Sequence, residues 1–110
     1  MTTITIMRPG APEEVRPVEQ LADDPGYPAL KAIVEPFLDG GDLEHVTVLH
    51  DGKRTDMFVD ECGSLKGLPR NEPATSIYRN NWLTQHPKED PESLPAIYGP
   101  AVLFSRRVWF

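Results

Sequence analysis

Residues 43–59 read LEHVTVLHDGKRTDMFV, and they contain the clearest strand signals in the chain. Its first part is rich in β-branched side chains, and Val46 and Val48 share one face of the strand that it predicts. Residues 55–59 resume the strand pattern after an Asp-Gly pair at 51–52, a dipeptide typical of tight turns between antiparallel strands. The stretch therefore predicts a β-hairpin.

Three further segments have strand patterns. Residues 3–6 alternate threonine and isoleucine, which is the period of a half-buried strand. Residues 14–18 predict another strand with Val15 facing inward, and Pro17 favours an edge position because proline cannot donate to a strand ladder. Residues 101–104 (AVLF) predict a buried final strand.

Two helices are expected. Over residues 28–35 the apolar side chains recur at helical spacing, and Pro36 ends the regular helix because it lacks a backbone donor. A turn is expected at 39–42. Asn71 is a favourable N-cap, and residues 72–83 predict a second helix after it. The pattern predicts an α+β fold: a small antiparallel sheet of four to five strands with one main helix packed on it and a second short helix.

The chain has 110 residues, enough for one domain and too few for two independent cores, so a single domain over 1–110 is expected. Residues 65–70 (LKGLPR) predict an extended passage that buries both leucines. Residues 86–95 contain three prolines and four charges, which indicates a surface loop. Residues 105–110 are expected to form a tail.

Acidic residues outnumber basic ones, 17 to 11, which gives a formal net charge of -6 and an isoelectric point near 4.9. This balance opposes general binding to nucleic acids or to anionic membranes, because both require a surplus of Lys and Arg. The single cysteine, Cys62, excludes an intramolecular disulfide. The sequence starts without a signal-peptide pattern and has no apolar run near the roughly 20 residues that span a bilayer. A cytoplasmic protein is therefore expected.

The sequence shows no catalytic, metal-binding or cofactor-binding pattern. His45 and His50 lie five residues apart, which places them on opposite faces of the predicted strand, and no second cysteine is available for a metal site. Asp60 and Glu61 oppose thiolate formation at Cys62. Neither glycine cluster matches a phosphate-binding loop. The sequence predicts a protein that is not an enzyme and that binds no metal or cofactor.

Two surface features favour a binding partner. Between residues 10 and 51 there are ten acidic residues against two basic ones, a bias that can steer a basic partner or imitate a nucleic-acid backbone. Arg106, Arg107 and Trp109 are of types enriched at interface hot spots, and Trp82 adds another aromatic side chain. These residues are candidate contacts for another protein, or for a second copy of the chain in a homodimer. The alternative is that Trp109 and Phe110 only cover the end of the sheet.

Residues 61–75 read ECGSLKGLPRNEPAT, which resembles the E-x-G-x-L-x-G-L-P-x-N-x-x-A pattern of a small domain family of unknown function, DUF thirty-eight forty-six. Residues 28–34 (PALKAIV) look like the L-x-x-L-V helix of that family, and residues 97–103 (IYGPAVL) look like its closing strand. The family occurs in phage genomes and bacterial mobile elements. The resemblance implies an accessory protein of a phage or mobile element, for which the expected location is the cytoplasm of the host cell, and it brings no catalytic residues.

The motif has two interpretations. It is either a structural turn followed by a helix cap, or a partner-binding site that presents four polar side chains: Glu61, Lys66, Arg70 and Asn71. On these grounds the predicted function is protein–protein binding without catalysis. One alternative is a nucleic-acid or nucleotide-binding module, which would need several basic side chains on one face (Lys66, Arg70, Arg79, Arg106 and Arg107). Another is an acidic decoy of a DNA-binding host enzyme.

Overall fold

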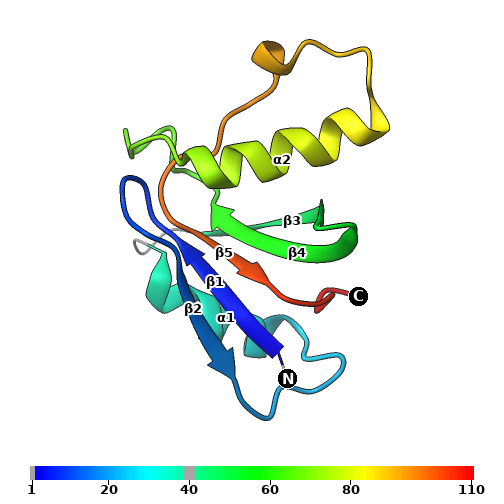
Figure 1. The fold of residues 1–110 in the computed structure, drawn as a ribbon. Coiled ribbons are helices and arrows are strands. Elements are labelled where there is room, and N and C mark those ends of the chain that lie inside the picture. The colour runs from blue at the N-terminus through cyan, green and yellow to red at the C-terminus, as the bar shows by residue number, and fades with distance from the viewer. Residues whose placement is uncertain (1, 39–41) are drawn as a thin grey trace.

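Five strands form one antiparallel sheet in the computed structural model, which describes residues 2–38 and 42–110. The strands are β1 (Thr2–Met7), β2 (Glu14–Val18), β3 (Leu43–His50), β4 (Lys53–Asp60) and β5 (Ala101–Phe104). Their spatial order is β2-β1-β5-β4-β3, so two hairpins flank the strand that comes last in the chain (Figure 1). The expected strands and the hairpin at 43–59 are confirmed. The turn expected at 39–42 lies outside the described residues except for Asp42.

The helices α1 (Tyr27–Val34) and α2 (Glu72–Gln85) pack on opposite faces of this sheet (Figure 1). The regular part of α1 ends at Val34, and Pro36 lies in the short 3-10 helix η1 (Glu35–Phe37) that follows. Asn71 caps α2, because its side-chain oxygen accepts a hydrogen bond from the backbone N–H of Ala74. The α+β prediction is confirmed, with α2 the longer of the two helices. Within the part of the chain that is described, no helix combines the length and hydropathy needed to cross a bilayer.

Strand alternation divides the core into two clusters, one on each face of the sheet. The cluster on the α1 face contains Leu30 and Val34 together with strand residues (Ile4, Ile6, Phe58, Val102 and Phe104). The cluster on the α2 face contains Ala74 together with the intervening strand residues (Met7, Val48, Met57, Val59, Ala101 and Leu103). Since β4 lies between β3 and β5 and has a cluster on each face, its side chains are buried from Thr55 to Asp60. Two carboxylates of β4, Asp56 and Asp60, are therefore in the interior.

The prediction that Val15 faces inward is wrong. Val15 pairs with Thr5 on the α2 side of the sheet and is 63% exposed. The helix α2 packs against β3, which is the edge strand farthest from β2, so this face of β2 remains uncovered.

The prediction of an extended passage at 65–70 is wrong up to Gly67, where the chain forms consecutive turns, whereas Arg70 forms a β-bridge with Tyr98. Leu65 is 88% exposed and Leu68 is half-buried. The backbone N–H of Leu68 donates to the carbonyl of Gly63 at 3.0 Å, which closes the turn and directs Leu65 into solvent. The loop at 86–95 contains a short 3-10 helix, η2 (Pro91–Ser93), and it buries Leu94.

Candidate functional site

The buried carboxylate of Asp56 fastens segment 105–110 to the sheet. Asp56 lies in the middle of β4 and is only 1% exposed. Its Oδ2 accepts hydrogen bonds from the backbone N–H groups of Val108 at 2.7 Å and Trp109 at 2.9 Å. Its Oδ1 lies 2.6 Å from Nε2 of His45, on the neighbouring strand β3. An ionised carboxylate only accepts hydrogen bonds, so the imidazole donates this one. These three donors compensate for the loss of water around the carboxylate.

The ring of Trp109 is positioned by contacts with three other rings. It stacks on the imidazole of His45, with the ring centroids 4.5 Å apart and an interplanar angle of 14°. Tyr27, the first residue of α1, meets the indole edge to face at 6.1 Å and 87°. Phe58, the cross-strand neighbour of His45, packs against both rings, and its ring centroid lies 5.4 Å from that of His45 and 6.2 Å from that of Trp109. The position of Trp109 is thus fixed by β3, β4 and α1 together.

Three aromatic side chains remain in contact with solvent here, and we call them the aromatic surface: Tyr27, Trp109 and Phe110, which are 47%, 36% and 65% exposed. They line a hollow of about 170 Å³ whose other walls include Asp24. The guanidinium of Arg107 lies over the ring of Phe110, 4.9 Å from its centroid.

The motif at 61–75 is placed at the end of the sheet where α2 begins. Lys66 forms an ion pair with the buried carboxylate of Asp60 at 2.7 Å, and Arg70 forms one with Glu72 at the same distance. Asn71 is completely buried, and its Nδ2 donates to the carbonyls of Met7 and Gly99 at 2.9 Å each. The assignment of Asn71 as a partner contact is therefore wrong for this conformation, because its side chain joins strand, loop and helix inside the protein. Glu61 remains exposed beside this turn.

Arg106 is a positioning residue rather than a free surface charge. Its guanidinium donates to the carbonyls of Ala22 at 2.7 Å and Asp23 at 3.1 Å, while Nε donates to Thr2 Oγ1 at 2.8 Å. These bonds hold the loop that leads into α1 and so place Tyr27 and Asp24.

The remaining candidates do not gather into one patch. Trp82 lies on α2 and stacks on His86 at 4.5 Å, so it is on the opposite side of the sheet from Trp109. The five basic residues that a nucleic-acid-binding module would need do not form a single group. Arg70 pairs with Tyr98 just before β5, whereas Arg106 follows the other end of that strand.

The described residues, 2–38 and 42–110, bring together no group of three or more His, Cys, Asp or Glu side chains that could hold a metal ion. An Asp–His pair is also the arrangement that orients a general base in hydrolases. Here Trp109 covers one face of the imidazole of His45, and no hydroxyl or thiol of the described chain is hydrogen-bonded to that ring. The geometry of the pair thus favours the anchoring of Trp109.

Comparisons of the chain with protein-family models, with curated proteins and with solved structures found no match. The resemblance of residues 61–75 to a phage-associated family therefore stays a prediction.

Proposed function

We propose that this chain is a protein-binding module that docks its partner on the aromatic surface. The observation that carries the proposal is the fixed position of Trp109, which is exposed although its ring and its backbone N–H are both held. Side chains that are already ordered before binding lose little conformational entropy in a complex. Trp and Tyr, which provide two of the three rings, are enriched at interface hot spots.

The chemistry around the hollow favours a partner that presents a lysine or arginine side chain. Asp24 lines the hollow together with the three rings, and aromatic faces attract cations. The net charge of -6 would steer a basic partner toward the protein, and it opposes pairing of two identical copies.

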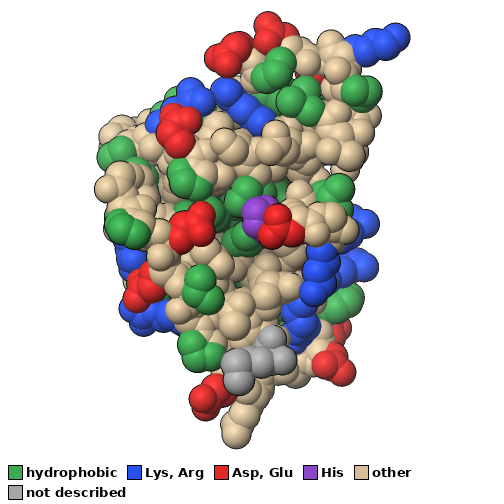
Figure 2. All heavy atoms as spheres, in the orientation of Figure 1, with side chains coloured by type: hydrophobic (Ala, Val, Ile, Leu, Met, Phe, Trp, Pro, Cys, Tyr) green, Lys and Arg blue, Asp and Glu red, His purple; other side chains and the backbone are tan. Residues whose placement is uncertain are grey.

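The alternative functions have less support from the surface. Lys66 and Arg70 are engaged in ion pairs, and Arg79 donates to the carbonyl of Leu94 at 3.0 Å. Figure 2 shows one face of the molecule, on which acidic and basic side chains are interspersed. That face offers neither a continuous basic track for phosphates nor a continuous acidic surface that would imitate DNA.

A photo-crosslinking amino acid in place of Phe110 tests the proposal in a cell lysate. We expect a basic protein to crosslink, and we expect its yield to fall with rising salt because exposed charges are screened. Tyr27→Ala and Trp109→Ala in the same background should abolish the crosslink, whereas Leu65→Ala should not, because Leu65 is exposed on a different part of the surface. Circular dichroism confirms that each variant is folded. The proposal fails if no protein crosslinks, or if both aromatic variants retain the crosslink.

A further inference from the structure

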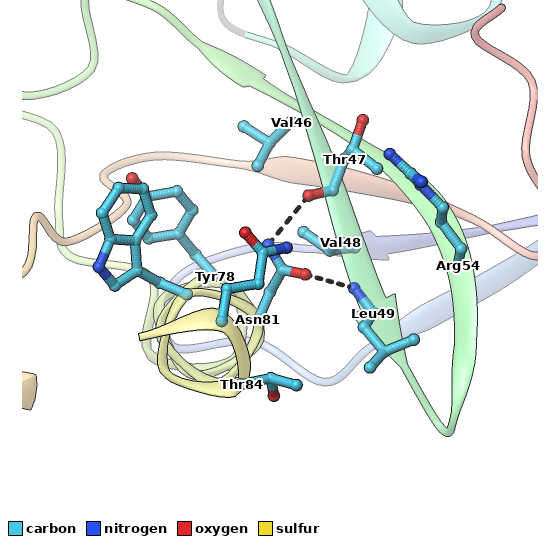
Figure 3. Close-up of a pocket in the computed structure, with 10 residues that line it drawn as sticks. Val46, Thr47, Val48, Leu49, Arg54, Tyr78, Asn81 and Thr84 are labelled. Atoms are coloured by element: carbon cyan, nitrogen blue, oxygen red, sulfur yellow. Dashed lines mark hydrogen bonds between the residues drawn. The ribbon is translucent and has the colours of Figure 1, made fainter. Parts of the chain in front are cut away.

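A groove separate from the aromatic surface runs between the free edge of β3 and the C-terminal half of α2 (Figure 3). Its volume is about 460 Å³. Apolar side chains line it from both elements: Val46 and Val48 from β3, Tyr78 and Trp82 from α2. Because β3 is the outermost strand of the sheet, the backbone on this side of it faces the groove and not another strand. We call this feature the β3–α2 groove.

The side chain of Asn81 occupies part of this strand edge. Its Nδ2 donates to the carbonyl of Thr47 at 3.1 Å, and its Oδ1 accepts from the N–H of Leu49 at 2.9 Å (Figure 3). The side-chain amide of Asn81 thus makes two hydrogen bonds to β3 of the kind that the backbone of a neighbouring strand would make. The alternation of an antiparallel ladder also directs the N–H and C=O of His45 toward this edge, where the described residues place no further strand.

We propose that the β3–α2 groove receives an extended segment of a partner protein, which adds to the sheet along β3 and displaces the amide of Asn81. Strand addition derives its affinity from main-chain hydrogen bonds and its specificity from pockets for alternate side chains. The edge of β3 supplies the main-chain groups, and the wall formed by Tyr78 and Trp82 supplies an apolar pocket. This inference is independent of docking on the aromatic surface.

Charge defines the segment further. Arg54 lines the groove beside Leu49, is exposed, and has no ion-pair partner among the described residues. Glu44, which is exposed near the opposite end of β3, has none among them either. A complementary segment therefore carries an acidic residue at the Leu49 end, a basic residue at the Glu44 end, and an apolar residue between them. A second copy of the chain is a poorer occupant, since each copy has a net charge of -6.

The test uses a library of capped octapeptides, selected against the full chain and followed by amide NMR. We expect binders with the stated charge pattern, and shifts concentrated at His45, Thr47 and Leu49. Asn81→Ala should bind about tenfold more tightly, because the peptide then displaces no internal hydrogen bonds. Asn80→Ala, the same change at an exposed neighbouring position, should bind like the unaltered protein.

A peptide that is N-methylated at alternate residues provides the control for main-chain pairing, because it retains the side chains and loses backbone donors. It should not bind. The proposal is overturned if this peptide binds as well as its parent, or if no library member binds folded Asn81→Ala. It is also overturned if Asn81→Ala forms dimers through β3, because the occupant is then a second copy. Arg54→Glu should shift the selected peptides from an acidic to a basic residue at the Leu49 end, and an unchanged selection contradicts the charge assignment.

Discussion

Replacing Asp56 with alanine leaves three hydrogen-bond donors without their acceptor: the N–H groups of Val108 and Trp109 and the imidazole of His45. A buried donor without a partner costs about 1–3 kcal/mol. Val108 is fully buried and belongs at the upper end of this range, whereas His45 and Trp109 retain some access to water and belong at the lower end. The sum is about 5 kcal/mol, a large part of the roughly 5–15 kcal/mol that stabilises a typical domain.

Urea unfolding followed by far-ultraviolet circular dichroism measures this loss. In a thermal melt, the midpoint should fall by about 20 °C. Asp56→Asn should lose less, about 1–2 kcal/mol, because an amide oxygen still accepts from the backbone and the amide N–H₂ can donate to the other tautomer of His45. Asp24→Ala is the control, since Asp24 is exposed, and it should change the stability by less than about 0.5 kcal/mol. An Asp56→Ala variant within about 1 kcal/mol of the unaltered protein would refute the assignment of Asp56 as the anchor of segment 105–110.

Three other predictions concern the fold. Hydrogen bonds from Arg16 and Arg8 hold the pKa of Glu14 below its ordinary value. The ion pairs therefore stabilise the folded state above the unfolded pKa, and this contribution is lost as the pH falls through the folded pKa. Arg16→Ala should raise the pKa of Glu14 in an NMR titration, and an unchanged pKa would contradict the assigned cause. Asn71→Ala should lower the free energy of unfolding by about 2–4 kcal/mol, because it removes a helix cap and the two hydrogen bonds that its buried amide donates to backbone carbonyls. A loss below about 1 kcal/mol would disprove this role. Gly63→Ala should lower the melting temperature of the protein more than Gly67→Ala does. A Cβ at Gly63 would lie 2.3 Å from a backbone carbonyl oxygen, whereas Gly67 has open space around it and only a positive φ. The reverse order would show that the turn at Gly63 rearranges at little cost.

The elements of the sheet could be predicted because their signals are local. The period of 3–6 and the Asp-Gly turn of 43–59 each specify a strand or a hairpin without reference to the rest of the chain. The exposure of Val15 could not be predicted in this way. The sequence does not distinguish the two faces of the β1–β2 hairpin. The position of α2, which is set by contacts far along the chain, leaves one of these faces uncovered.

The candidate site was predictable only in part. The sequence predicts Trp109 as a surface aromatic residue, and Trp109 is exposed. Its anchor, Asp56, is not predicted, although Asp56 is two residues from Phe58 and therefore shares its buried strand face. Composition does not distinguish a polar side chain that points into solvent from one that forms hydrogen bonds with backbone groups of the protein. For this reason Asn71 and Arg106 were selected as contact residues, whereas their hydrogen bonds hold other segments of the protein in place.

The strand order also bears on how the chain is synthesised. A ribosome that has released residues only as far as 95 has produced both hairpins, but not β5, which joins them by pairing with β1 on one side and β4 on the other. Two-stranded hairpins are marginally stable in water, and at that stage both core clusters still lack the side chains that β5 contributes. Until β5 arrives, β1 and β4 each present an unpaired edge to other nascent chains and to chaperones. Residues 1–110 therefore complete their sheet only when β5 is available, and stalled nascent chains should acquire protease resistance in this region only once Ala101–Phe104 has left the exit tunnel.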